Sequence, residues 1–274
     1  MSGIPDSSTS ELQDELLELP PEIQGLLPAT GGYRLDRVGR TGSVIRLYET
    51  VVLKVQVADE QSRREHELLA WLDGRLPVPK VLGWAEEDGL FYLLESRIPG
   101  RMLAASEVMD DSPYLLARLA EAFRLLDGVG AEACPLDAGT AVKLAEARRR
   151  VEAGLVSGDR VDAKTIGPGG FQSPEALLDW LERKQPPYEP AFVHGDCCLP
   201  NILALGESVS GFIDLGRGGR GDRWLDVGLC MRSLRYNHGN RGGLTELETR
   251  FYQELGLEPD PERVRYYILL DELF

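Results

Sequence analysis

The chain has 274 residues, of which 43% are hydrophobic and 27% charged, a composition typical of a folded globular protein. Its 45 acidic and 30 basic residues give a net charge of −15, which argues against broad electrostatic binding to nucleic acid or to an anionic membrane. No apolar run approaches the ~18 residues that a membrane span needs, and the first residues are acidic, so we expect neither a membrane span nor a signal peptide.

The four cysteines, Cys134, Cys197, Cys198 and Cys230, form no metal-binding pattern. They include no CxxC pair and the chain has only three histidines, so a structural zinc site is disfavoured. Cys197 and Cys198 are adjacent and poorly placed to bridge to each other, and a reducing, cytoplasmic location fits best. No apolar stripe marks an oligomer interface, so we expect a monomer.

The first third of the chain is predicted to be rich in strands. Apolar and β-branched residues alternate with polar ones after residue 33, whereas apolar residues follow helical spacing after residue 59. The expected elements are a short helix over 10–19 that stops at Pro20-Pro21, two or three antiparallel strands within 33–57, a helix over 59–72, and a hairpin over 81–98 with its turn at Asp88-Gly89.

From residue 100 onward the pattern is mainly helical, with two short strands within 190–216. One helix has a clear start, because Ser173 is a good N-cap and Pro174 a good first helical residue. Helices are expected over 112–128, 140–156, 173–184, 223–236, 244–256 and 261–274. We therefore predict an α+β protein with two lobes, residues 1–97 and residues 98–274.

Lys54 lies within an apolar strand, and Glu65 follows on the next helix. A lysine in such a strand is costly to bury unless a partner meets its charge. A strand lysine held by a helix glutamate is how kinases set a cation against nucleotide phosphates. Two simpler interpretations stay open, an edge strand with Lys54 in water and a solvated helix face at Glu65.

A glycine-containing segment at 39–43, which includes Gly42 and Ser43, joins two strands ahead of Lys54. Small residues let backbone N–H groups approach phosphate oxygens, but this signal alone is weak and an ordinary hairpin turn is the favoured explanation of the segment. The chain has no GxxxxGK[ST] sequence, so a P-loop nucleotide hydrolase is disfavoured.

The strongest local motif is HGDCCLPN at 194–201, followed thirteen residues later by Asp214 at the end of a strand. Asp196, Asn201 and Asp214 thus fall at neighbouring strand or loop ends, and carboxylate and amide oxygens suit Mg²⁺. Asp196 can accept or orient a hydroxyl proton, and phosphoryl transfer needs little beyond such positioning and charge neutralisation. The alternative is a set of Asx turns and helix caps.

Two other interpretations of this region are disfavoured. A thiol nucleophile at Cys197 or Cys198 paired with His194 lacks a third group to orient it. The GxGxxG spacing at 216–221 is typical of dinucleotide-binding proteins, but that fold needs an alternating strand–helix series, and the chain continues here as helix.

Taken together, these motifs resemble the aminoglycoside 3'-phosphotransferases. The resemblance covers nearly the whole chain from about residue 33 and rests on Lys54, Glu65, the HGD…N motif, LPVPKVLGW at 76–84, GFIDLGRGGRGDRWLD at 211–226 and YYILLDELF at 266–274. HGDxxxxN alone marks a wider superfamily that includes choline, homoserine and macrolide kinases, whereas the longer strings are more specific.

The resemblance implies a two-lobed, protein-kinase-like fold and transfer of a phosphoryl group from ATP, with Mg²⁺, to the 3'-hydroxyl of a kanamycin- or neomycin-type aminoglycoside, which confers resistance. Residues 1–97 would bind nucleotide, and residues 98–274 would hold the catalytic loop and the aminoglycoside. The implied roles are Asp196 as catalytic base, Asn201 and Asp214 as magnesium ligands, Arg217 near the reacting groups, Lys54 on the phosphates with Glu65 holding it, Gly42 and Ser43 over the phosphates, Val52 and the backbone of Ser96 and Ile98 at the adenine, and Glu272, the carboxylate of Phe274 and, as a neighbour, Asp271 at the substrate ammonium groups.

The sequence departs from the family in two substrate-binding segments. Some relatives have paired acidic residues where this chain has Tyr236 and Asn237, and the loop at 160–171 keeps Asp162 but lacks a dense acidic set. Asp162 and Asn237 are the candidate substrate contacts in these segments. Fewer anionic contacts imply a narrower or shifted substrate range, or weaker substrate binding.

Two alternatives to an aminoglycoside kinase stay open. The first is a kinase of the same superfamily that acts on another hydroxyl- or amino-bearing metabolite. The second is a nucleotide-binding module without catalysis, although the intact set of motif residues argues against it. A protein substrate is disfavoured, because the chain lacks the long activation segment and APE motif of protein kinases.

Overall fold

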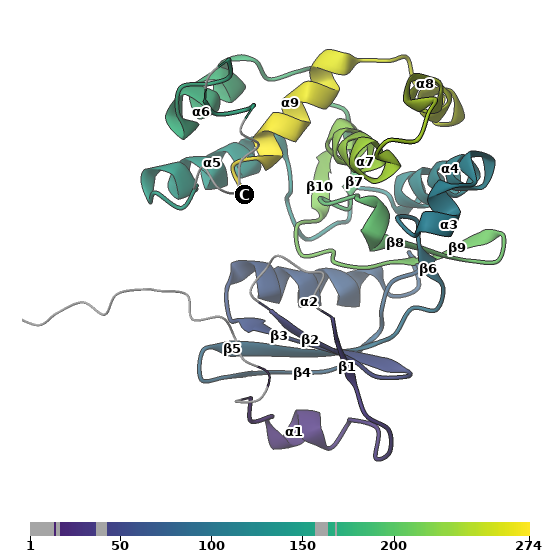
Figure 1. Ribbon diagram of the computed structural model, residues 1–274. Helices are drawn as coiled ribbons and strands as arrows, with labels where there is room; N and C mark the ends of the chain where they lie inside the picture. The colour runs from purple at the N-terminus through teal and green to yellow at the C-terminus, as the bar shows by residue number, and fades with distance from the viewer. Residues whose placement is uncertain (1–13, 15–16, 37–42, 157–163, 168) are drawn as a thin grey trace, which may run out of the picture. The chain divides into compact units, whose positions relative to one another are not determined.

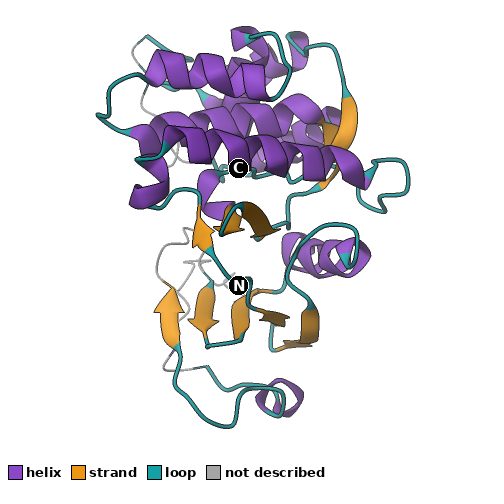
Figure 2. Cartoon of the chain, turned by 90° about the vertical axis from the view of Figure 1, so that its right-hand side faces the viewer, coloured by secondary structure: helices purple, strands orange, loops and turns teal. Residues whose placement is uncertain are grey.

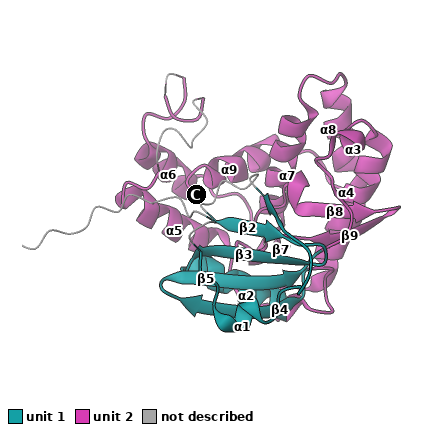
Figure 3. Ribbon diagram, turned by 60° about the horizontal axis from the view of Figure 1, so that its bottom comes forward, with its two compact units in different colours: residues 1–70, 79–97 teal, residues 71–78, 98–274 magenta. Residues whose placement is uncertain are grey.

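The structure is a computed structural model that describes the chain except for residues 1–13, 15–16, 37–42, 157–163 and 168 (Figure 1). The chain divides into two compact units (Figure 3). The first contains residues 1–70 and 79–97, and the second contains residues 71–78 and 98–274.

The first unit is built on a five-stranded antiparallel sheet in the order β1-β2-β3-β5-β4. The hairpin turn between β4 and β5 is formed by Asp88 and Gly89, both with positive φ (51° and 76°), as predicted for an Asp-Gly pair. The strands are β1 (Arg34–Asp36), β2 (Val44–Leu47), β3 (Val51–Val57), β4 (Val81–Glu87) and β5 (Leu90–Ser96).

Helices cover both faces of this sheet (Figure 1). Because side chains alternate along β3, Leu53 and Val55 enter a core with Ile23 of α1 (Pro21–Gln24). Lys54 faces the other way, where α2 (Glu60–Leu72) packs. The sheet thus presents one polar side chain to a helix that the sequence predicts to carry its partner.

The helix predicted over 10–19 is wrong for residues 17–19, which are not helical. The helix instead begins at Pro21, the residue expected to stop it. Proline is favourable at the first helical position, because its missing N–H would have no helical partner there. Leu17 and Leu19 pack against the core of the first unit in a non-helical segment.

The second unit is mainly helical (Figure 2). Ser173 caps α6 by accepting a hydrogen bond from the Ala176 N–H at 3.3 Å, with Pro174 as first helical residue, as predicted. Two helices end three or more residues earlier than predicted, at Glu152 and Asp271, and the first of these is followed by Gly154 in a left-handed conformation (φ 67°). The helices are α3 (Ser106–Met109), α4 (Ser112–Val129), α5 (Thr140–Glu152), α6 (Pro174–Arg183), α7 (Arg223–His238), α8 (Leu244–Glu254) and α9 (Pro261–Asp271).

Two small sheets accompany these helices. One has the order β6-β8-β9 and the other pairs β7 with β10, antiparallel throughout. Segment 216–221, with its GxGxxG spacing, forms the start of β10 in its second half and is not a dinucleotide-binding turn. The strands are β6 (Arg101–Met102), β7 (Pro190–Val193), β8 (Ile202–Leu205), β9 (Ser208–Phe212) and β10 (Gly219–Asp222), more than the two predicted here. Within the described residues, no helix is both long and apolar enough to cross a membrane.

Candidate active site

The HGDCCLPN motif at 194–201 lies between β7 and β8 in the second unit. β7 pairs with β10 through Val193 and Gly219, so the residues just beyond these strand ends lie side by side. Gly195 shows how closely: it has a φ of +83°, and a Cβ atom built on it would lie 2.0 Å from the carbonyl oxygen of Arg217. Only glycine fits both the backbone conformation and the space.

Asp226, near the start of α7, fixes the backbone of this loop. Its Oδ2 accepts the N–H of His194 at 2.7 Å, and its Oδ1 accepts the N–H of Gly195 at 3.0 Å. The side chain is buried, and burial raises its pKa to about 6 against the opposing effects of His194 and the two amides. Sequence reasoning missed this residue, although it ends the string that carried the resemblance.

His194 ties the loop to the segment that bears Asp214. Its ring is fully buried, with Nδ1 accepting the N–H of Asp196 at 3.3 Å and Nε2 lying 3.0 Å from the carbonyl oxygen of Ile213. Because a carbonyl only accepts, Nε2 is the donor in this contact. The histidine of the motif is therefore a structural link and not a nucleophile's base.

Asp196, Asn201 and Asp214 come together as predicted by their positions at strand and loop ends. The N–H of Ile213 donates to the carbonyl of Asn201 at 3.0 Å, which places the adjoining Asp214 beside Asn201. The Asn201 amide donates to the carbonyl and to Oδ2 of Asp196, at 3.0 and 3.2 Å. Cys198 donates its S–H to Oδ1 of Asp196 at 2.9 Å.

The donor set fits Mg²⁺. The nitrogen of the Asn201 amide faces Asp196, which leaves the amide oxygen on the other side as a metal donor. Asp214 is exposed and has a φ of +64°, a conformation costly for a non-glycine residue that is often found at functional sites. Among the described residues no three His, Cys, Asp or Glu side chains gather as a metal cage, and Mg²⁺ in kinases typically needs only one or two protein ligands besides phosphates.

Arg217 and Arg232 share one carboxylate, that of Asp271. The two Nη2–oxygen distances are 2.5 and 2.6 Å, and the Asp271 side chain is 8% exposed. Burial alone would raise the pKa of Asp271, but the two guanidinium groups outweigh it and hold the pKa below its ordinary value. The predicted substrate contact at Asp271 is thus engaged by two arginines.

Phe274 lies among cations. Its ring centroid is 4.9 Å from Cζ of Arg217, 5.8 Å from Cζ of Arg150 and 5.6 Å from Nζ of Lys143. Lys143, which sequence reasoning missed, is buried on α5 and points at the Arg217 carbonyl, 3.5 Å away. Burial, and then the charge of Arg217, lower its pKa to about 8.

The other predicted substrate contacts have different surroundings. Glu272 is half-buried and directly follows the last residue of α9. The Asn237 amide donates to the carbonyl and hydroxyl of Ser233, one turn earlier in α7, at 2.8 and 3.2 Å. Asp162 and the predicted phosphate contact Gly42 lie outside the described residues.

The first unit holds the predicted nucleotide contacts other than Ile98. Nζ of Lys54 lies 2.6 Å from Oε1 of Glu65, with side chains only 9% and 4% exposed, so neither is the solvated residue of the simpler interpretation. Val52 is half-buried on the same face of β3 as Lys54, and Ser43 is half-buried just before β2. Ser96 ends β5 and pairs with Lys80 through its N–H and its hydroxyl, each at 2.9 Å.

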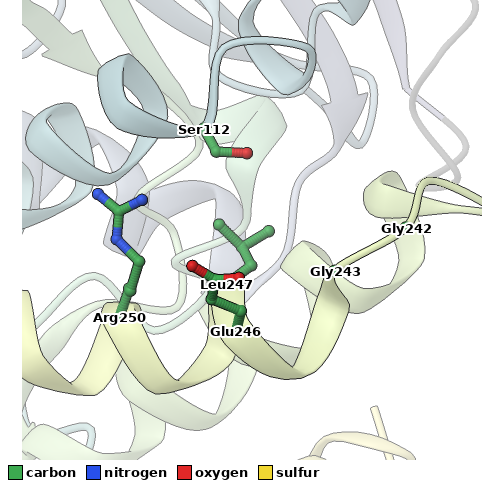
Figure 4. A pocket seen from close by; sticks show the side chains of 6 residues that line it. All are labelled: Ser112, Gly242, Gly243, Glu246, Leu247 and Arg250. Atoms are coloured by element: carbon green, nitrogen blue, oxygen red, sulfur yellow. The ribbon is translucent and has the colours of Figure 1, made fainter.

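Two further observations complete the placement. Ile98, half-buried at the start of the larger segment of the second unit, packs against Gly211. A hollow of about 190 Å³ lies between the starts of α4 and α8 and is unrelated to the predicted site (Figure 4). Its lining residues are Ser112, Gly242, Gly243, Glu246, Leu247 and Arg250.

Residues 26–267 match the model of the phosphotransferase enzyme family. The chain belongs to this family. A curated phosphotransferase from Niallia circulans, an aminoglycoside 3'-phosphotransferase, is 36% identical over 271 residues, which span 98% of this chain and all of that protein. The family assignment therefore covers the whole domain and not a shared motif alone.

Solved phosphotransferase structures have the same fold. The aminoglycoside 3'-phosphotransferase of type VIII is 31% identical, with a TM-score of 0.74 over 92% of this chain and 97% of that one. The phosphotransferase APH(3'')-Id from Streptomyces rimosus, in complex with ADP and streptomycin, is 27% identical, with a TM-score of 0.75 over the same shares. The predicted α+β, kinase-like fold and the prediction of a kinase are confirmed.

Proposed function

We propose that this phosphotransferase transfers the γ-phosphoryl group of ATP to the 3'-hydroxyl of kanamycin- or neomycin-type aminoglycosides and thereby confers resistance. The observation that carries the proposal is the end-to-end similarity to an aminoglycoside 3'-phosphotransferase. The geometry of the catalytic loop supports it, because Asp196, Asn201 and Asp214 are gathered on a backbone fixed by Asp226.

In the proposed reaction the Asp196 carboxylate accepts a hydrogen bond from the substrate hydroxyl and takes its proton as the oxygen attacks the γ-phosphorus. The bond between that phosphorus and the bridging oxygen breaks, and ADP leaves with the electron pair. Mg²⁺, when held by Asn201 and Asp214, neutralises phosphate charge. Arg217, which Asp271 holds in place through an ion pair, is the cation that we propose lies near the reacting groups.

The nucleotide contacts in this proposal belong to the first unit, except for Ile98, which is in the second. Lys54, held by Glu65, binds the α- and β-phosphates as a point charge, with Gly42 and Ser43 as backbone donors. Val52 gives aliphatic contact to the adenine, and backbone groups of Ser96 and Ile98 pair with its edge. Each of these roles follows from the family resemblance and can be tested by substituting the residue.

For the substrate, we propose that Glu272, Phe274, Asp162 and Asn237 contact the aminoglycoside. Carboxylates recognise ammonium groups through charge-assisted hydrogen bonds. Asp271 acts differently in this proposal, because its two oxygens already meet two guanidinium groups. It orients Arg217 and Arg232 and does not bind the substrate directly. We further propose a cytoplasmic monomer.

A coupled ADP-release assay tests the function. It uses Mg-ATP with kanamycin, neomycin, the 3'-deoxy aminoglycoside tobramycin, streptomycin, choline and homoserine, and Asp196→Asn as the inactive control. Turnover with kanamycin or neomycin but not with tobramycin supports the proposal. Turnover with tobramycin as well would move the transfer to another hydroxyl.

A second candidate function is phosphorylation of streptomycin. The similarity to a solved phosphotransferase that binds ADP and streptomycin favours it. Turnover with streptomycin alone would establish it in place of the 3' activity. Turnover with choline or homoserine alone would instead favour a metabolite kinase, consistent with Tyr236 and Asn237 standing where some relatives have acidic residues.

A further inference from the structure

Cys198 differs from the other three cysteines, all of which the structure describes. Cys134, Cys197 and Cys230 are buried, whereas Cys198 is partly exposed and lies beside the carboxylate of Asp196. The Sγ–Oδ1 distance is 2.9 Å. An ionised carboxylate only accepts hydrogen bonds, so the thiol is the donor in this contact.

The other oxygen of the same carboxylate has its own donor. The Asn201 amide reaches Oδ2 at 3.2 Å, while the Asp196 N–H is engaged by the imidazole of His194. One donor on each oxygen fixes the rotation of the carboxylate about its last torsion, which is otherwise broad. Without the thiol, only the Asn201 side would be held.

The surroundings keep the thiol protonated. Burial and the neighbouring Asp196 charge raise the pKa of Cys198, and they outweigh the Arg232 guanidinium, which favours the thiolate. A protonated thiol donates a hydrogen bond but attacks poorly, because the thiolate is the nucleophile. The protonated thiol agrees with the sequence analysis, which disfavours a cysteine nucleophile.

We propose that Cys198 is a positioning residue for phosphoryl transfer, whose S–H holds the Asp196 carboxylate in the orientation that receives the substrate hydroxyl. The inference rests on the proposed function of Asp196. It differs from a packing role in a measurable way: the hydrogen-bond donor matters and the sulfur volume does not. Small misplacements of a catalytic group reduce turnover more than they reduce binding.

The test compares Cys198→Ala with Cys198→Ser and uses Cys134→Ala as a matched control at another cysteine. We expect Cys198→Ala to lower kcat about tenfold, as one hydrogen bond to a charged group is worth, while KM for ATP and for the aminoglycoside stays within about twofold. Cys198→Ser keeps a donor and should retain most of kcat. Cys134→Ala should leave kcat unchanged, and thermal unfolding of each variant verifies that it is folded.

Two results would overturn the inference. One is an unchanged kcat in a folded Cys198→Ala variant, and the other is a serine variant no better than the alanine variant. If the wild type is active, either result leaves the proposed function intact. A wild type that turns over no aminoglycoside would instead remove the proposed function, and this inference with it.

Discussion

The buried pair of Lys54 and Glu65 allows a double-mutant cycle that separates structure from catalysis. Both side chains are nearly inaccessible and their charged atoms are 2.6 Å apart. Lys54→Met leaves a buried carboxylate without its main partner, and Glu65→Leu leaves a buried ammonium. Removing one member of such a pair destabilises a protein by about 3–5 kcal/mol, whereas replacing both by apolar residues is close to neutral.

The magnitude follows from the geometry. At 2.6 Å and an effective dielectric constant of about 20, two unit charges attract by about 6 kcal/mol, and partial hydration of the surviving charge reduces the net loss. If the two substitutions acted independently, together they would lower the stability of the double variant by about 6–10 kcal/mol. We predict instead that the free energy of unfolding of the double variant lies within about 1 kcal/mol of the wild-type value.

Urea unfolding followed by circular dichroism measures these free energies, and ADP release measures turnover. The double variant should be stable yet inactive, because the proposed contact of Lys54 with the α- and β-phosphates is lost. The exposed pair Arg63–Glu86 in the same unit is the control, and Glu86→Gln should leave the urea midpoint almost unchanged. A Lys54→Met variant as stable as the wild type would refute the reasoning, since the pair would then not be a buried one.

Three further predictions concern the second unit. Asp226→Asn retains one acceptor for two buried amide N–H groups, and the unpaired group, at about 1–3 kcal/mol, should loosen the loop and lower kcat at least tenfold in steady-state kinetics; an unchanged kcat contradicts the role of Asp226. The folded-state pKa of Lys143 is depressed from 10.5 to about 8, so its buried charge destabilises the wild type below pH 8, and this penalty disappears as the pH rises toward 10.5. In urea unfolding, Lys143→Met should therefore be more stable than the wild type by about 3 kcal/mol at pH 7, and the difference should close by pH 10.5. A stability difference that does not change with pH would contradict this prediction. Chelation should abolish turnover and added Mg²⁺ should restore it, with Asp214→Asn needing about tenfold more Mg²⁺ for half-maximal rate; equal Mg²⁺ requirements would remove Asp214 from the metal site.

Features that depend on neighbouring residues were predictable from the sequence. The Asp88-Gly89 turn requires only two positive φ angles, and the Ser173-Pro174 start requires only a cap and a proline. The Lys54–Glu65 contact was also within reach, because a strand followed directly by a helix limits where the two side chains meet. Pro21 was misread for the converse reason, since proline marks both the end of one helix and the start of another.

Contacts between distant segments were not predictable. Asp226 holds amides 31 and 32 residues earlier, and nothing in its local sequence shows that α7 begins behind β7. In the sequence, Asp271 looks like a free carboxylate at a helix end. In the structure its oxygens meet Arg217 and Arg232, which lie 54 and 39 positions earlier in the chain. The burial of the Asp226 and Asp271 carboxylates depends on tertiary packing. The same burial determines the structural roles of both side chains.

The position of the phosphate on the product tests the central claim most directly. Kanamycin is treated with Mg-ATP and the enzyme, and the product is analysed by phosphorus–proton correlation NMR. The account predicts one phosphate, attached to the 3'-oxygen, and no product with Asp196→Asn. A phosphate on any other hydroxyl, or transfer that persists without the Asp196 carboxylate, would contradict it.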